Sequence, residues 1–246
     1  MDISIIIPVY DEHKKVARDI KLASDFVVGN GFTGEIIVVD DGSSDGTAEA
    51  ARGAEIAEGV RLVVEGYPEN RGKGHAVRSG VGASKGKYVM FADCGCCVPY
   101  DNALTGLKVL GDEGGGIDIV HASRKHAESR IHKHQGLCRR FCSWAFRRLL
   151  ALYMKVPAEL TDTQCGFKIY KGDVARELYG ECKTDGFAFD IEIILLARMK
   201  GYRIAEFGVE WVCDPDSRLS IRRSFWRVLG ELVSIKRRLL KKQAGR

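Results

Sequence analysis

A chain of 246 residues, of which 45% are hydrophobic and 29% charged, is long enough for one sizeable core and too apolar for a disordered protein. No apolar run reaches the roughly 18 residues that a membrane-spanning helix needs, and no basic segment precedes the short apolar stretch at the N-terminus. We therefore expect a cytoplasmic protein without a signal peptide, whose eight scattered cysteines stay reduced.

The net charge of +5 conceals two strongly basic segments. Residues 121–155 carry a net charge of +8 and residues 218–246 carry +9, so the rest of the chain is acidic at −12. An acidic body with two basic segments predicts an anionic ligand or an anionic surface as a partner. No recognised nucleic-acid-binding module accompanies these basic residues, so we do not expect that partner to be a nucleic acid.

The first 120 residues alternate between apolar, β-branched runs and amphipathic segments. In chain order we expect strands at 3–9, 35–39, 60–65, 88–92 and 117–122, separated by helices at 12–28, 44–54, 74–83 and 102–110. Fully apolar strands separated by helices predict an α/β fold whose mostly parallel, twisted sheet is covered by helices on both faces.

The second half of the chain is less regular. We expect a basic, aromatic helix at 135–154, a strand at 163–170, a helix at 189–200 and a strand at 203–207. Residues 221–242 predict a final amphipathic helix, because apolar side chains recur there every third or fourth position, and a linker at 214–220 precedes it. The expected organisation is thus a main domain at 1–217 and a basic amphipathic tail at 218–246.

Polar residues follow several of the expected strands. Asp40 and Asp41 end the second strand before a Gly-Ser turn, and Asp93 ends the fourth. Ligands of such sheets bind at the carboxyl ends of the strands, so these side chains are candidates for one site. Asp40 and Asp41 can accept hydrogen bonds from a base or a ribose, although a turn with a helix cap explains them equally well. Asp93 suits a hard cation on a diphosphate, or else belongs to an ordinary turn.

Lys73 lies between two glycines at the start of an expected helix. The first glycine of a P-loop is missing, but the backbone donors and dipole of a helix N-terminus still suit a phosphate. Cys94, Cys96 and Cys97 are poor candidates for a zinc site, because no second cysteine pair lies at ligand spacing.

Taken in order, the motifs resemble those of the family 2 inverting glycosyltransferases. They are Pro-Val-Tyr-Asp-Glu at 8–12, Val-Val-Asp-Asp-Gly-Ser at 38–43, Asn-Arg-Gly-Lys-Gly at 70–74 and Phe-Ala-Asp at 91–93. Two further motifs, Asp-Thr-Gln-Cys-Gly-Phe-Lys at 162–168 and Phe-Ala-Phe-Asp-Ile-Glu at 187–192, resemble the polyprenyl-phosphate sugar synthases within that family, which make dolichyl-phosphate glucose or mannose. The resemblance covers roughly residues 2–220.

This resemblance implies a nucleotide-diphospho-sugar transferase fold of the GT-A type and a divalent metal, Mg²⁺ or Mn²⁺. It implies transfer of a hexose with inversion from a nucleotide-diphosphate sugar, UDP-glucose or GDP-mannose, to a polyprenyl or dolichyl phosphate. Two alternatives stay open: a glycan or lipid hydroxyl as acceptor, and a non-catalytic paralogue that only binds the nucleotide sugar.

The resemblance also assigns roles to single residues. The nucleotide-binding residues are Pro8, Tyr10 and Glu12 of the first loop, and Asp40 and Asp41, which hold the base and ribose with Lys73 nearby. Asp93 matches the first acid of the metal-binding Asp-x-Asp motif, whereas Gly95 stands where the second acid belongs. One carboxylate can suffice for Mg²⁺ when phosphates and water complete its coordination.

Arginines are expected to bind the phosphates. Arg124, Arg139 (or its neighbour Arg140) and the loop residue Arg218 fall where the family places such arginines. A lipid phosphate is already an anion and needs no general base, but a hydroxyl acceptor does. Asp162 and Asp190 are the candidates for that base, or for a sugar-hydroxyl contact.

The expected acceptor lies in a membrane that this chain is not expected to span. The helices at 135–154 and 221–242 combine apolar and basic residues, as interfacial helices do, so we expect peripheral binding to an anionic membrane surface. The alternative is that their apolar faces pack on the protein's own core or on a homodimer interface.

Overall fold

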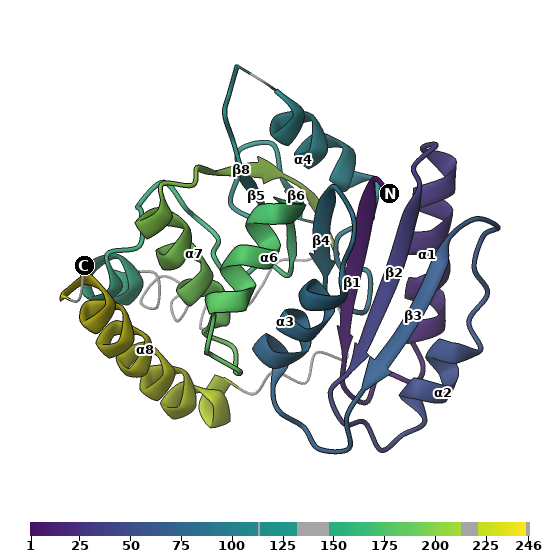
Figure 1. The fold of residues 1–246 in the computed structure, drawn as a ribbon, viewed down its shortest axis with the longest axis horizontal. Coiled ribbons are helices and arrows are strands. Elements are labelled where there is room, and N and C mark those ends of the chain that lie inside the picture. Colours follow the sequence, from purple (N-terminus) through teal and green to yellow (C-terminus); the bar gives the residue numbers. More distant parts are fainter. Residues whose placement is uncertain (113, 132–147, 213–220, 245–246) are drawn as a thin grey trace.

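The structure, a computed structural model, describes residues 1–112, 114–131, 148–212 and 221–244, and in the last range the side chains of 226–242 (Figure 1). The first half alternates strands and helices as the apolar pattern predicts. Its elements are β1 (Ile3–Val9), α1 (Val16–Gly29), β2 (Gly34–Asp40), α2 (Thr47–Arg52), β3 (Arg61–Gly66), α3 (Lys73–Ala83), β4 (Tyr88–Ala92) and α4 (Asn102–Gly111).

The second half contains elements that the sequence analysis did not expect. Its elements are β5 (Ile119–Ser123), β6 (Arg130–Ile131), the π-helix η1 (Leu150–Met154), β7 (Phe167–Lys171), α6 (Gly172–Glu181), α7 (Phe189–Lys200), β8 (Ile204–Gly208), β9 (Glu210–Trp211) and α8 (Ile221–Ala244). The helix α6 and the short β6–β9 pair were missed. Most of the expected helix at 135–154, and nearly all of the linker at 214–220, lie outside the described residues.

The main sheet has seven strands in the order β3-β2-β1-β4-β7-β5-β8. All neighbouring strands are parallel except β7, which runs antiparallel to β4 on one side and to β5 on the other. The expected α/β fold with a mostly parallel sheet is therefore confirmed. The strand expected at 163–170 begins only at Phe167, because the preceding residues form the turn that brings the chain back into the sheet.

Helices cover both faces of the sheet because successive side chains of a strand point to opposite sides. On β1, Ile5 and Ile7 join the core beneath α1 and α4, whereas Ile6 joins the core beneath α3, α6 and α7. Figure 1 shows α1 and α3 on opposite faces of the sheet. The carboxyl ends of β1, β2 and β4 thus lie at one edge, between the two helical layers.

The basic helix α8 packs against the same core as α3, α6 and α7. Leu232, Ile235 and Leu239 are buried in that core, and Val228 packs at its margin. The apolar stripe that suggested an interfacial helix therefore contacts the protein's own interior along these four residues. In the part of the chain that the structure describes, no helix combines the length and the apolar character needed to cross a membrane.

Candidate active site

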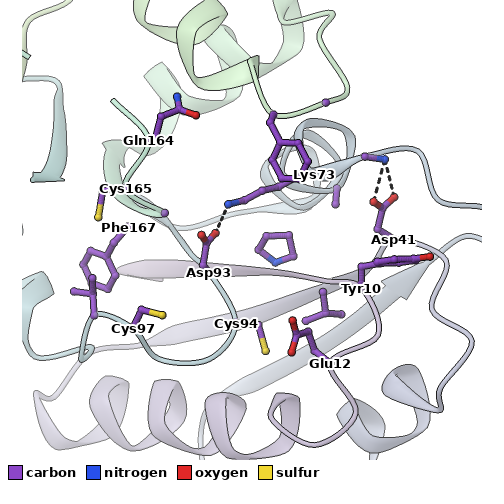
Figure 2. A pocket seen from close by; sticks show the side chains of 18 of the residues that line it. Tyr10, Glu12, Asp41, Lys73, Asp93, Cys94, Cys97, Gln164, Cys165 and Phe167 are labelled. Carbon is purple, nitrogen blue, oxygen red and sulfur yellow. Dashed lines mark hydrogen bonds and ion pairs between the residues drawn. The ribbon is translucent and has the colours of Figure 1, made fainter. Parts of the chain in front are cut away.

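A cavity of about 470 Å³ lies at the carboxyl ends of β1, β2 and β4 (Figure 2). Seven of the expected site residues line it: Pro8, Tyr10, Glu12, Asp41, Lys73, Asp93 and Arg124. Asp40, Asp162 and Asp190 are buried and do not belong to the lining, while Arg139 and Arg218 lie outside the described residues. The cavity falls within the range of roughly 300–1,000 Å³ that is usual for small-molecule sites.

Asp41 builds one wall of this cavity. Its carboxylate accepts hydrogen bonds from the Tyr67 hydroxyl at 2.7 Å, the Asn70 amide at 2.9 Å, and the backbone N–H groups of Arg71 and Gly72 at 2.8 and 3.0 Å. Gly42 allows this segment to approach, because its φ is +75° and a Cβ would lie 2.6 Å from the carbonyl carbon of Glu69. Asp41 therefore fixes the segment 67–72 beside the cavity.

Asp40 has a similar local role one residue earlier. Its Oδ1 accepts hydrogen bonds from the backbone N–H of Ser43, at 3.0 Å, and from the Ser43 hydroxyl. The carboxylate is only slightly exposed, so it shapes the turn that follows β2 and lies behind the lining of the cavity.

Lys73 and Asp93 form an ion pair at the centre of the site. The Lys73 ammonium lies 2.5 Å from Asp93 Oδ1 and 5.6 Å from the centre of the Phe91 ring (Figure 2). Burial alone would lower the pKa of Lys73, but the carboxylates of Asp93 and Asp190 outweigh it and raise that pKa. Lys73 is thus a permanent cation beside the candidate metal ligand.

Gly166 makes room for the Asp93 carboxylate. A Cβ at this position would collide with the carboxylate of Asp93, whose backbone N–H donates to the Gly166 carbonyl at 2.8 Å. Because Gly166 directly precedes β7, this close approach depends on the antiparallel entry of β7 beside β4.

Asp190 lies beneath the cavity in a buried ion pair. Its Oδ1 is 2.9 Å from the ammonium of Lys168, which is fully buried and also donates to the Cys165 carbonyl at 2.7 Å. Burial raises the pKa of Asp190, and Lys168 partly offsets that shift. This carboxylate neutralises a buried lysine and is not part of the cavity lining.

Asp162 holds Arg124 in a bidentate ion pair. The Arg124 Nε and a terminal nitrogen donate to the two carboxylate oxygens at 2.6 and 2.8 Å. Burial alone would raise the pKa of Asp162, but the hydrogen bonds from Arg124 outweigh this effect, so the pKa is lowered. Arg124 lies over the Trp211 ring at 5.6 Å, so its guanidinium is fixed at the edge of the cavity.

Of the carboxylates that line the cavity, that of Asp93 is the candidate metal ligand from the sequence analysis. Among the described residues no group of three or more His, Cys, Asp or Glu side chains can hold a metal ion. Gly95 has a φ of +105°, which other residues rarely adopt, so this loop conformation disfavours a second acid at that position. One carboxylate fits Mg²⁺ if the phosphates of a bound donor supply further ligands.

Several lining residues had no role in the sequence analysis. Among them are Gln164, Phe187, Trp211 and Arg227. Gln164 and Phe187 belong to the motifs quoted above and could have been proposed from them. Trp211 and Arg227 reach the cavity from β9 and α8, and nothing in their local sequence indicated it.

Comparisons with solved structures define the fold. The structure of glucosyl-3-phosphoglycerate synthase from Mycobacterium tuberculosis, in complex with Mn²⁺, UDP and phosphoglyceric acid, matches with a TM-score of 0.68 at 21% identity, over 95% of this chain and 78% of that one. Mannosyl-3-phosphoglycerate synthase from Rubrobacter xylanophilus matches with a TM-score of 0.66 at 19% identity, over 100% and 76% of the two chains. The fold is therefore the GT-A fold of nucleotide-sugar transferases.

Sequence comparisons identify the family. The family model described as Glycosyl transferase family 2 matches residues 4–179 of this chain. The dolichyl-phosphate beta-glucosyltransferase of Drosophila melanogaster is 32% identical over 92% of this chain and 71% of its own length, and that of Homo sapiens is 28% identical over 97% and 76%. The chain belongs to glycosyl transferase family 2 and is a glycosyltransferase.

Proposed function

We propose that this glycosyltransferase transfers glucose, with inversion, from UDP-glucose to a dolichyl or other polyprenyl phosphate. The names of its relatives support this acceptor and sugar. The structural observation that carries the proposal is the cavity at the ends of β1, β2 and β4, where Asp93 lies beside two cations, Lys73 and Arg124. Such a set of charges suits a reaction between a diphosphate and a second phosphate.

A divalent ion, Mg²⁺ or Mn²⁺, belongs to this proposal. Structural relatives hold Mn²⁺ or Mg²⁺ together with UDP. In this chain Asp93 would be the protein ligand, and the bound ion would stabilise the negative charge that develops on the leaving UDP. Lys73 lines the same cavity and pairs with Asp93, so its ammonium would help to neutralise the same diphosphate.

The carboxylates of the cavity favour a phosphate acceptor over a hydroxyl. Of the three that line it, Glu12 pairs with Lys15 at 3.5 Å, Asp41 holds segment 67–72, and Asp93 pairs with Lys73. A hydroxyl acceptor needs a base. The two earlier candidates, Asp162 and Asp190, do not line the cavity and are paired with Arg124 and Lys168. A phosphate oxygen attacks without losing a proton, so positioning and charge neutralisation suffice.

The remaining roles follow from the geometry and from the family resemblance. Arg124, held by Asp162, would neutralise the phosphates together with Arg139 and Arg218, which lie outside the described residues. Pro8 and Tyr10, which line the same cavity as Asp41, would contact the nucleotide.

The experiment compares donors and acceptors in pairs. The full chain is incubated with Mg²⁺ or Mn²⁺ and UDP-glucose or GDP-mannose, and with a polyprenyl phosphate or the polyprenol of equal length. We expect glucosylated polyprenyl phosphate from UDP-glucose and no product from the polyprenol. Product from the polyprenol alone would establish a hydroxyl acceptor, and a preference for GDP-mannose would overturn the proposed donor.

A further inference from the structure

The helix α8 contributes a side chain to the active-site cavity. Arg227 lines the cavity that also contains Lys73, Asp93 and Arg124. It also lines a second cavity of about 370 Å³ between the start of α3, the segment 183–186 and α8. Arg227 therefore lies where the two cavities meet, next to Gly72 and Gly186, which line both.

Arg227 differs from the other two basic side chains that line the cavity in its ionic partner. Lys73 pairs with Asp93 at 2.5 Å and Arg124 with Asp162 at 2.6 Å. Arg227 is exposed, and its charge interacts with that of Glu231, one turn further along α8. Its guanidinium lines the cavity and can therefore also contact an anion that enters it.

The position of Arg227 is fixed through its own helix. Glu231, one turn further along the same face, accepts a hydrogen bond from the backbone N–H of Ala188 at 2.9 Å, and a Cβ on Gly186 would collide with its carboxylate. Arg238 donates to the Thr184 hydroxyl at 2.8 Å, and Ile235 is fully buried between these contacts and the core. α8 therefore cannot shift without releasing the segment 184–188, which includes the lining residue Phe187.

We propose that Arg227 is a phosphate-binding residue of the active site and that Glu231 is a positioning residue for the segment 184–188. The inference rests on the proposed function for the identity of the two phosphate compounds, the donor diphosphate and the acceptor monophosphate. Both offer the oxyanions that a guanidinium binds, and the test distinguishes them.

The test of Arg227 uses a charge-matched control away from both cavities. Arg227→Gln is compared with Arg52→Gln, because Arg52 is exposed on α2 and lines neither cavity. Calorimetry with UDP and Mg²⁺ measures the donor site, and the KM for polyprenyl phosphate at saturating donor measures the acceptor site. We expect Arg227→Gln to weaken one of them about tenfold, and Arg52→Gln to change neither.

Each outcome has a distinct meaning. A weaker Kd for UDP assigns Arg227 to the donor diphosphate, and a higher KM for the lipid with unchanged UDP binding assigns it to the acceptor. Equal behaviour of the two variants would overturn the inference. UDP binding is measured without turnover. A higher Kd for UDP in Arg227→Gln would therefore support Arg227 as a phosphate ligand even if the wild-type chain were inactive in the transferase assay. Such inactivity would overturn only the proposed function.

Glu231 is tested by a rescue. Glu231→Gln keeps a carbonyl oxygen that can accept from the Ala188 N–H, whereas Glu231→Ala leaves that donor without its partner. We expect Glu231→Ala to lower kcat at least fivefold and Glu231→Gln to retain most of it, with both variants melting cooperatively. Equal kcat in Glu231→Ala and the wild type, or equal losses in both variants, would show that Glu231 does not position the segment.

Discussion

Asp93 is the side chain on which the chemistry of the cavity depends most directly. We expect Asp93→Asn to lower kcat by at least about 100-fold, because the amide is a poor metal ligand and leaves the Lys73 charge unpaired. Turnover is measured together with a thermal unfolding curve, which should show that Asp93→Asn is folded. Asp25→Asn, a change at an exposed carboxylate on α1, is the control. Unchanged turnover in Asp93→Asn would exclude this carboxylate as a metal ligand.

His121 is a buried titratable residue away from the cavity lining. It is 1% exposed, and among the described residues neither ring nitrogen has a hydrogen-bond partner. Burial lowers the pKa of His121 well below 6.5, and the neighbouring Lys168 acts in the same direction. The native state therefore keeps a neutral imidazole where the unfolded chain would take up a proton.

This difference predicts how stability depends on pH. The unfolded state binds the extra proton below about pH 6.5, so stability is full above that pH and falls as the pH decreases, by up to about 1.4 kcal/mol per pH unit. We expect His121→Phe to flatten the pH dependence of the unfolding free energy between pH 5 and 7, as measured in urea. An unaltered slope in His121→Phe would contradict the prediction.

Whether the role of a site residue could be predicted depends on which elements its interaction partners belong to. Asp93 and Lys73 lie at a strand end and a helix start, and parallel strands bring such positions to one edge of the sheet. The ion pairs of Asp162 and Asp190 were not predictable, since Arg124 directly follows β5 and Lys168 lies in β7. Both carboxylates therefore seemed available as bases until their tertiary contacts were known.

At the scale of elements, α8 is a structural part of the domain. Ile235 is fully buried in the core, whereas Leu240 on the same helix is 55% exposed. We expect Ile235→Ala to lower the unfolding free energy by about 2–5 kcal/mol and Leu240→Ala to change it by less than about 0.5 kcal/mol. Chemical denaturation measures both. Equal small effects would mean that α8 does not contribute to the cooperative core.

The helix α6 was missed in the sequence analysis, although its apolar residues have helical spacing. Val174, Ala175, Leu178 and Tyr179 are buried with helical spacing, so its amphipathic character was visible. It follows β7 without a connecting loop and begins at Gly172, against the Gly86 carbonyl. No capping side chain marks this boundary, and the sequence analysis left the apolar positions unassigned.

At the scale of the whole molecule, we propose that the outer surface of α8 meets an anionic membrane. Trp226 is 77% exposed, and Arg237 and Lys241 are exposed on the same helix. We expect Arg237→Glu/Lys241→Glu to reduce flotation with vesicles containing phosphatidylserine, and salt to weaken wild-type binding likewise. Lys14→Glu/Lys21→Glu, at the N-terminal side of the molecule, is the control. A wild-type chain that does not float would contradict the proposed surface.

The order of the strands in the sheet could not be predicted from the sequence pattern. Apolar strands and intervening helices predict a parallel sheet, and they did so correctly for β1, β2, β3 and β4. They do not indicate that β7 enters between β4 and β5 in the opposite direction. That insertion depends on pairings across 75 or more residues, such as Ala92 with Phe167, which local spacing does not reveal.

The position of β7 has a consequence for how the protein opens. Among the described strands of the main sheet, β7 alone joins the group β3-β2-β1-β4 to the group β5-β8 by backbone hydrogen bonds, and it is paired along both edges. Separating the two groups therefore requires the amides of β7 to lose their partners. In hydrogen–deuterium exchange, the N–H groups of Ile169 and Tyr170 should thus be among the last to be labelled, at the rate of global unfolding, whereas those of the edge strand β3 should exchange earlier through local opening.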